Sequence, residues 1–440
     1  MLLTIVTAGS RGDVQPYVAL GLGLRRAGHR VRLATHETFR EFVTGRGLEF
    51  EALAGDPQAI LRGAAADAWL ASGRSRNMLG FVREFRRTAG LLVEQWLHDY
   101  WRVCREADAV IFSAVATPAH DVARRLGVPS IGAYLQPLSR TAEFPTIGLL
   151  GRAGAMDADV VGTREPGALR RAFNYATHVA AEQAMWQPFR GRVNRWRAET
   201  LGVARAPFLG PYGAMWRERV PLLYGFSPRV VPKPADWGPH VHVTGYWVLP
   251  PDESWRPDPA LEAFLAAGEP PVYVGFGSMT PATAGRLTEI ALGALERAGQ
   301  RGVLLKGWGS LGEGDLPTWA TAVRDVPHEW LLPRMRAVVH HGGAGTTGAA
   351  MRAGVPSVVV PLGFDQPFWG RRVAALGVGP EPVPRRRLAA DALARAIEQA
   401  VADPAMRERA AALGATLRAE DGVARAVEAV EGELRGARRR

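Results

Sequence analysis

The sequence predicts an α/β fold with two doubly wound, Rossmann-like domains facing across a cleft. Three observations predict this architecture. The chain has 440 residues, which is long for one hydrophobic core and suits two domains of roughly 200 residues each. Apolar strand-like runs alternate with amphipathic helical stretches in two separate blocks. A proline-rich stretch without clear periodicity, residues 226–251, separates the blocks and is expected to be a linker.

The first block, residues 1–225, is expected to form an N-terminal domain. Buried strands are predicted at residues 2–7, 29–35, 48–53, 108–113 and 129–135, with helices at 14–28 and 118–127. Repeated strand–helix–strand units of this kind build a parallel sheet. Two helical stretches rich in Trp, Phe and Arg, residues 68–107 and 167–200, are expected to be insertions into that domain.

The second block, residues 252–440, repeats the alternation. Strands are predicted in "PPVYVGFGS", "RGVLLKG", "AVVHH" and "PSVVVPL", and helices at 286–298 and 345–353. The last ~50 residues are helical, and we expect the final helices to pack back toward the N-terminal domain.

Composition excludes several classes of protein. The formal charge is +11, but the 54 basic side chains, all arginines except Lys233 and Lys306, are scattered. No nucleic-acid-binding motif accompanies them, so we expect no nucleic-acid partner. The single cysteine, the lack of a leader-like N-terminus and the lack of a membrane-spanning run predict a cytoplasmic protein. The abundance of Ala, Gly and Arg is typical of a GC-rich bacterial genome.

A ligand site is predicted where "AVVHHGGAGTT" turns from strand to helix. In parallel sheets, ligands bind beyond the carboxyl ends of the strands, and the first helical amides favour phosphate. His341 offers a ring nitrogen, Gly343 and Gly345 let the backbone approach a ligand, and Thr346 adds a hydroxyl. The pattern predicts a diphosphate cradle. The alternative is an ordinary glycine-rich turn with a capping threonine.

Three other strand ends carry polar residues. Ser278 follows the first strand of the second block and is expected to donate to the same phosphates. Asp365 and Gln366 follow "SVVVPL", where a carboxylate and an amide suit vicinal sugar hydroxyls. In "GSRGDVQP", Asp13 is a candidate general base or a helix cap, and Ser10 and Arg11 are candidate phosphate contacts. In the sequence, Ser10, Arg11 and Asp13 follow the first predicted strand of the chain.

Two stretches of the sequence resemble the same enzyme family. Residues 326–373 closely resemble the nucleotide-sugar signature of family 1 glycosyltransferases with the GT-B fold. "GSRGDVQPYVALGLGLRRAGHRVRLATHETFREFV" resembles the start of the sterol 3β-glucosyltransferase branch and its bacterial natural-product relatives. The resemblance implies an inverting hexosyltransferase that uses a nucleotide sugar, most simply UDP-glucose, with no cofactor and no metal.

The resemblance also implies roles for individual residues. His341, Gly345 and Thr346 match positions that hold the diphosphate, Asp365 and Gln366 those that hold the sugar, and Val326 one that contacts the base. Asp13 matches the catalytic base of the sterol and bacterial branches. Ser113 stands where plant enzymes carry an aspartate that assists a histidine base, and Ala349 where they carry a ribose-binding glutamate. A dTDP-sugar therefore remains an alternative to UDP-glucose.

The acceptor is expected to be an apolar, hydroxyl-bearing small molecule such as a polyketide, macrolide, flavonoid or sterol. Tyr134, Gln136 and Phe144, after a strand of the first block, are the candidate acceptor contacts. Aromatic residues of the helical insertions could line an apolar pocket or simply pack together; they are Phe81, Phe85, Trp96, Trp101, Phe173, Trp186 and Trp196. We expect a monomer or weak dimer that contacts membranes transiently.

Three alternative interpretations compete with this one. The "DAD" at Asp157–Asp159 matches a metal-binding pattern of other glycosyltransferases, but it lies in a Gly/Ala-rich stretch and is interpreted as chance. A non-catalytic nucleotide-sugar-binding protein would keep His341 without needing Asp13 or the Asp365–Gln366 pair. A UDP-sugar epimerase would not need an acceptor pocket.

Overall fold

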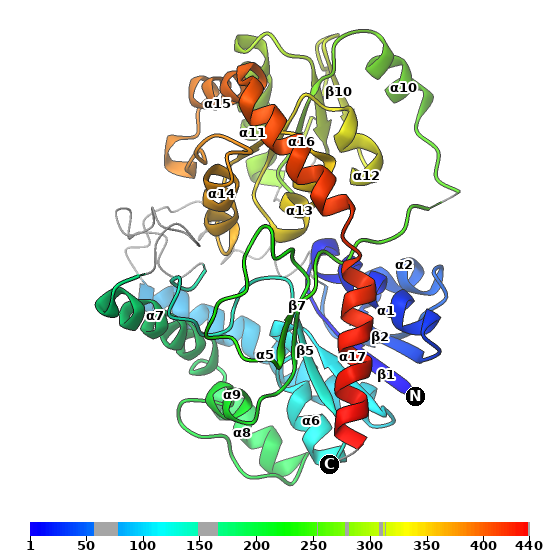
Figure 1. Cartoon of the computed structure of the whole chain (residues 1–440), viewed down its shortest axis with the longest axis vertical. Coiled ribbons are helices and arrows are strands. Elements are labelled where there is room, and N and C mark those ends of the chain that lie inside the picture. The colour runs from blue at the N-terminus through cyan, green and yellow to red at the C-terminus, as the bar shows by residue number, and fades with distance from the viewer. Residues whose placement is uncertain are drawn as a thin grey trace. The chain divides into compact units, whose positions relative to one another are not determined.

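A computed structural model describes residues 1–56, 78–147, 166–252, 254–277, 281–307, 311–312 and 314–438, with the side chains of 78–89, 281–283 and 438 excepted. These residues form two compact units. Unit 1 falls within Met1–Leu150, Val161–Leu249 and Asp421–Arg440, and unit 2 within Pro250–Glu420. Each unit is an α/β sandwich around a parallel sheet (Figure 1).

Unit 1 is built on a seven-stranded parallel sheet of order β3-β2-β1-β4-β5-β6-β7. Its strands are β1 (Leu2–Val6), β2 (Arg30–His36), β3 (Glu49–Leu53), β4 (Ala109–Phe112), β5 (Ser130–Tyr134), β6 (Leu222–Tyr224) and β7 (Val241–Val243). Ile5 in β1 pairs with Leu33 and with Ile111, and all three side chains are fully buried. The apolar runs form central strands because both faces of the sheet are covered.

The helices of unit 1 include one from the far end of the chain. They are α1 (Arg11–Arg26), α2 (Arg40–Thr44), α5 (Met78–Cys104), α6 (Ala119–Leu126), α7 (Ala168–Trp186), α8 (Arg190–Glu199), α9 (Tyr212–Arg217) and α17 (Gly422–Arg438). Helix α17 packs on α1 (Figure 1), and its Val423, Ala426 and Val430 join the core of unit 1. Gly23 permits the contact, since a Cβ there would lie 2.4 Å from Val423. The last helix of the chain thus belongs to unit 1.

Unit 2 has a five-stranded parallel sheet of order β10-β9-β8-β11-β12. The strands are β8 (Val272–Gly275), β9 (Gly302–Leu305), β10 (Ala320–Val323), β11 (Ala337–His340) and β12 (Ser357–Val359). The helices are α10 (Pro259–Ala266), α11 (Pro281–Arg297), α12 (His328–Leu331), α13 (Ala344–Ala353), α14 (Gln366–Ala375), α15 (Ala390–Ala402) and α16 (Pro404–Arg418). Alternate strand residues supply two apolar clusters, with Val274 and Leu304 in one and Tyr273 and Val303 in the other.

The predicted linker is wrong in its bounds. Unit 1 extends to Leu249, because residues 241–243 pair with β6 as the edge strand β7. The strand is only three residues long and lies in a proline-rich stretch, so the sequence shows no clear alternation there.

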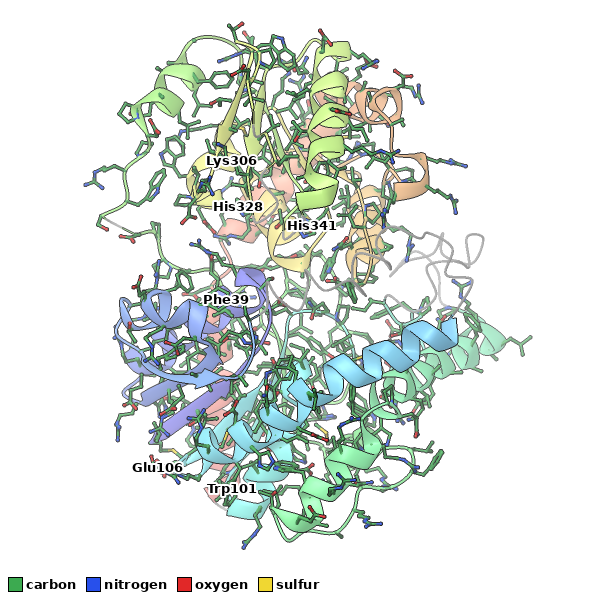
Figure 2. All side chains as sticks on the ribbon, turned by 180° about the vertical axis from the view of Figure 1, so that it is seen from behind. Phe39, Trp101, Glu106, Lys306, His328 and His341 are labelled. Atoms are coloured by element: carbon green, nitrogen blue, oxygen red, sulfur yellow. The ribbon has the colours of Figure 1, made fainter. Side chains whose placement is uncertain are left out.

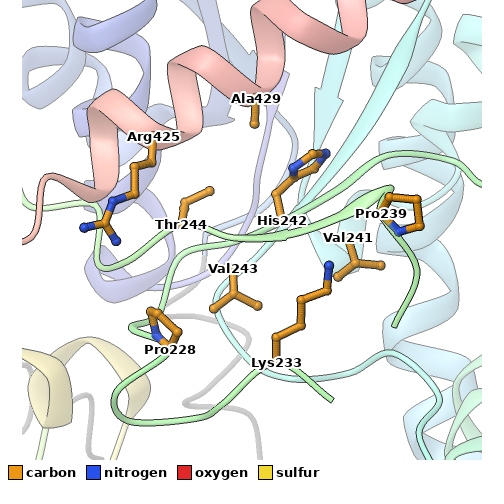
Figure 3. A pocket seen from close by; sticks show the side chains of 9 residues that line it. All are labelled: Pro228, Lys233, Pro239, Val241, His242, Val243, Thr244, Arg425 and Ala429. Carbon is orange, nitrogen blue, oxygen red and sulfur yellow. The ribbon is translucent and has the colours of Figure 1, made fainter. Parts of the chain in front are cut away.

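A hollow of about 410 Å³ lies beside β7 and α17 (Figure 3), and it is lined by Pro228, Lys233, Pro239, Val241, His242, Val243, Thr244, Arg425 and Ala429. None of the predicted site residues lines it.

Candidate active site

The turn between β1 and α1 holds the Asp13 carboxylate in a fixed position. Oδ2 of Asp13 accepts hydrogen bonds from the backbone N–H of Ser10 and from its hydroxyl, both at 2.9 Å. Gly9 makes room for the carboxylate: its φ is +136°, and a Cβ there would lie 2.5 Å from Oδ2. Glycine is therefore required at position 9 both by conformation and by space.

The second carboxylate oxygen of Asp13 is available for chemistry. Oδ1 has no hydrogen bond to any residue that the structure describes, whereas Oδ2 has two. Burial raises the pKa of Asp13 above its ordinary value of 3.8, and the two hydrogen bonds from Ser10 offset only part of that rise. A carboxylate with a raised pKa is a stronger base, so the arrangement suits proton abstraction by Oδ1.

The neighbours of Asp13 differ from the sequence prediction. The Ser10 hydroxyl was expected to reach a phosphate, but its one proton is donated to Asp13 in this structure. Arg11 is exposed, donates to Gln15 at 3.3 Å and lies over the Phe42 ring. In this structure Ser10 therefore positions Asp13. The contact between the Arg11 guanidinium and the nucleotide sugar stays a prediction.

The turn between β11 and α13 confines the His341 ring between two glycines. A Cβ on Gly277 would lie 2.7 Å from Cε1 of His341, and one on Gly343 would lie 2.6 Å from Nε2. Gly343 is the N-cap of α13, Gly345 is exposed and Thr346 is half-buried in the first turn. Free amides and a ring nitrogen thus meet at a helix start, which is the chemistry that binds phosphate.

Burial keeps His341 neutral. It lowers the pKa of His341 to about 4, with the Gly275 backbone offsetting part of the effect. At neutral pH the His341 ring can therefore offer a ligand a hydrogen bond but no positive charge. The preceding His340 is fully buried, and its Nδ1 accepts the Gly342 N–H at 3.1 Å, which stabilises the turn that carries His341. Sequence reasoning missed this role of His340.

The Asp365–Gln366 pair begins helix α14 and is organised by local hydrogen bonds. Oε1 of Gln366 accepts the backbone N–H groups of Leu362 at 2.7 Å and Gly363 at 3.0 Å. Oδ2 of Asp365 accepts the indole N–H of Trp369 at 2.9 Å. Because the amide oxygen of Gln366 is occupied, its NH₂ group is the part that can donate to a ligand.

The predicted acceptor residues are mostly interior. Phe144 is 1% exposed and packs against His178, and Tyr134 is 7% exposed and contacts Phe112 and Tyr224. Gln136 is half-buried. Trp186 and Trp196 are also buried, as helix packing predicts, while the side chains of Phe81 and Phe85 lie outside the described residues. In this conformation Phe144 serves packing, because its ring has almost no exposed surface.

The remaining predictions concern Val326, residues outside the described ranges, metal binding and membrane spans. Val326 is half-buried on the segment before α12. Ser278 and Asp157–Asp159 lie outside the described residues. The described residues contain no cluster of three or more His, Cys, Asp or Glu that could hold a metal. No helix in the described ranges is long and apolar enough to cross a bilayer.

Lys306 is a further candidate that sequence reasoning did not assign to the site. Lys306, which is labelled in Figure 2, directly follows β9. Strand β9 pairs with β8. The next residue, Gly307, approaches the Gly277 carbonyl, to which a Cβ would lie at 2.7 Å. A lysine at the strand-end edge that carries His341 is a source of positive charge for an anionic ligand. Its position as the first residue after a strand was the available signal.

Comparison with known proteins identifies the family. Residues 3–131 match the glycosyltransferase family 28 N-terminal domain, and residues 310–431 match the erythromycin biosynthesis protein CIII-like C-terminal domain. These matches cover the turns that carry Asp13 and His341. The chain belongs to the glycosyltransferases. The resemblance noted in the sequence is thereby confirmed.

Fungal sterol glucosyltransferases are similar to this glycosyltransferase along its whole length. Sterol 3-beta-glucosyltransferase of Emericella nidulans is 36% identical over 98% of this chain and 30% of its own length. That of Saccharomyces cerevisiae (strain YJM789) is also 36% identical, over 99% of this chain and 35% of its own length. The glycosyltransferase thus spans about a third of the length of these curated relatives.

Solved structures confirm the fold. The kitacinnamycin glycotransferase superposes with a TM-score of 0.65 at 20% identity, covering 98% of this chain and 99% of that one. The calicheamicin glycosyltransferase CalG4 gives 0.64 at 20% identity over 98% of both chains. The predicted GT-B class, with two Rossmann-like domains, is therefore correct for this glycosyltransferase.

Proposed function

We propose that the protein transfers glucose from UDP-glucose to a hydroxyl of an apolar acceptor and forms a β-glycoside with inversion. The observation that carries the proposal is the held Asp13 carboxylate, whose Oδ2 is fixed by Ser10 while Oδ1 is open. Asp13 takes the proton of the acceptor hydroxyl as its oxygen attacks the anomeric carbon. The bond from that carbon to the diphosphate breaks, and UDP leaves.

The protein must also stabilise the negative charge of the leaving diphosphate. The first amides of α13 carry partial positive charge, and neutral His341 adds a hydrogen bond. Donors aimed at developing charge are typically worth about 2.7–4 kcal/mol each. We assign this role to His341, Gly345 and Thr346, with Ser278 and Lys306 as additional donors.

Sugar recognition is assigned to Asp365 and Gln366, and Gln366→Glu tests it. Glutamate keeps an oxygen for the Leu362 and Gly363 N–H groups but loses the NH₂ donor. We expect the KM for UDP-glucose to rise about tenfold, roughly the loss of one hydrogen bond, with the Kd for UDP unchanged. Gln300→Glu, at a turn where the amide donates to Ala298, is the control. An unchanged donor KM would show that Gln366 does not meet the sugar.

The acceptor class follows from the sequence relatives. The name of the sterol 3-beta-glucosyltransferases supports a sterol or a similar polycyclic alcohol as the acceptor, because the 36% identity extends over nearly the whole chain. A polyketide-type acceptor with a dTDP-sugar is the second candidate. VinC, solved in complex with dTDP, superposes with a TM-score of 0.62 at 21% identity and supports that donor only by likeness of fold.

An apolar acceptor would be collected from a membrane surface, and the outer face of α7 suits such a contact. Leu169 is 90% exposed and Phe173, about one turn further along α7, is 38% exposed, with Arg171 also exposed. Apolar side chains beside arginine bind anionic bilayers. We expect Leu169→Glu to reduce co-sedimentation with phosphatidylserine-containing vesicles, and the exposed Leu209→Glu to serve as the matched control. Equal sedimentation of wild type and Leu169→Glu would exclude this face.

Turnover of defined donors tests the proposed function. Purified protein is incubated with UDP-glucose or dTDP-glucose and a panel of sterols, polyketides and flavonoids, with and without EDTA. We expect glucosides from UDP-glucose, with the rate unchanged by EDTA. Binding of UDP-glucose without any transfer across the panel would favour the non-catalytic binding protein, and transfer only from dTDP-glucose would favour the second candidate.

A further inference from the structure

His36 lies beside the turn that carries Asp13. It is the last residue of β2 and 1% exposed, and β2 lies between β3 and β1 in the sheet. Its Nε2 accepts the backbone N–H of Gly9 at 3.2 Å. Gly9 is the residue whose left-handed backbone, φ +136°, turns the chain from β1 into α1 and makes room for the Asp13 carboxylate.

The surroundings of His36 fix its ring and its protonation state. The ring packs against Trp96, with centroids 6.0 Å apart, and Trp96 is itself tied to the Ala54 carbonyl by a 2.8 Å hydrogen bond. Burial lowers the pKa of His36, and the backbone of Gly55 and Ala54 and the Asp56 carboxylate offset part of that effect. The ring is therefore neutral at pH 7, with Nε2 as the acceptor and the proton on Nδ1.

We propose that His36 is a positioning residue for Asp13, acting through the Gly9 N–H. The Ser10 N–H and hydroxyl that hold Oδ2 belong to the residue next to Gly9. The Gly9 N–H belongs to the peptide that is joined, through the Gly9 Cα, to the peptide carrying the Ser10 N–H. Anchoring the first peptide restrains the second, and the Ser10 N–H in turn orients the carboxylate. Without the acceptor, the part-buried N–H of Gly9 loses this hydrogen bond and the turn relaxes. The proposal rests on the assignment of Asp13 as the base.

Three variants separate this role from simple packing. In His36→Gln, the amide oxygen reaches about as far as Nε2 and can accept the Gly9 N–H. In His36→Asn the acceptor is one bond shorter, and in His36→Leu it is absent. His120→Leu is the control, because His120 is 5% exposed and its ring bonds Ser130 at the opposite end of the same sheet.

The readouts are kcat, donor KM, the Kd for UDP and the unfolding midpoint. Because small misplacements of a reacting group cost up to about 10²-fold, we expect kcat to fall about 10- to 100-fold in His36→Leu and His36→Asn, and to lie within about threefold of wild type in His36→Gln. Donor KM and UDP Kd should not change. The inference is overturned if folded His36→Asn and His36→Leu keep wild-type kcat, or if His36→Gln is as impaired as His36→Asn. Absence of transfer by the wild type would instead overturn the proposed function.

Discussion

Replacing Asp13 with asparagine is expected to lower kcat by about 10³-fold, in the middle of the range for loss of a general base. The amide cannot take a proton from the acceptor, although its oxygen can still accept the N–H of Ser10 that holds Oδ2 now. The residues proposed to bind the diphosphate are unchanged, so the Kd for UDP should equal that of the wild type. Steady-state transfer and calorimetric titration with UDP measure the two quantities.

The same substitution is expected to leave the protein at least as stable. Because the pKa of Asp13 is raised in the folded protein, stability is highest where the carboxyl is protonated and falls as pH rises through that pKa. A neutral amide removes this loss, so the unfolding midpoint at pH 7.5 should match or exceed that of the wild type. Full activity in folded Asp13→Asn would show that another group takes the proton.

The second large effect is expected from Gly343→Ala, which displaces His341 without removing it. The φ of Gly343 is −62°, which alanine adopts without strain, but the new Cβ would lie 2.6 Å from Nε2 of His341. The ring must move, so the hydrogen bond that we propose it makes to the diphosphate is weakened. We expect the Kd for UDP to rise about 10- to 100-fold, or about 1.4–2.8 kcal/mol.

The matched control is the same substitution at Gly285 in α11, where a Cβ meets nothing within 4 Å. Alanine there should leave UDP binding unchanged and the stability unchanged or slightly raised. Gly277→Ala would also reach His341, but its φ of +68° would add backbone strain and obscure the cause. Unaltered UDP affinity in Gly343→Ala would show that the diphosphate does not depend on His341.

The sequence was sufficient for the elements whose own pattern is strong. The apolar run at the N-terminus became β1, the amphipathic stretch after it became α1, and "AVVHH" became β11, each within three residues of its predicted start. Strands β6, β7 and β10 were not predicted. Each has only three or four residues, too few for a clear alternation of apolar and polar side chains. Strands β7 and β10 are also edge strands, each paired with a single neighbour.

The candidate site divides in the same way. Asp13, His341 and Gln366 could be found because each follows a strand of a parallel sheet, where ligands bind. The contacts that orient these three side chains could not be found from the sequence, because such contacts depend on which strands become neighbours. Ser10 donates to Asp13, His36 accepts from Gly9, and the His341 ring fits against Gly277, and only the folded arrangement shows these pairings.

The anomeric configuration of the product tests the central claim most directly. Direct, single displacement with Asp13 as base inverts the sugar, so UDP-α-glucose must yield a β-glucoside. We would record the proton NMR spectrum of the product from the wild-type reaction and read the coupling between the protons on C1 and C2. The large coupling of a β-glucoside is the predicted result. The small coupling of an α-glucoside would mean retention of configuration and would contradict the mechanism.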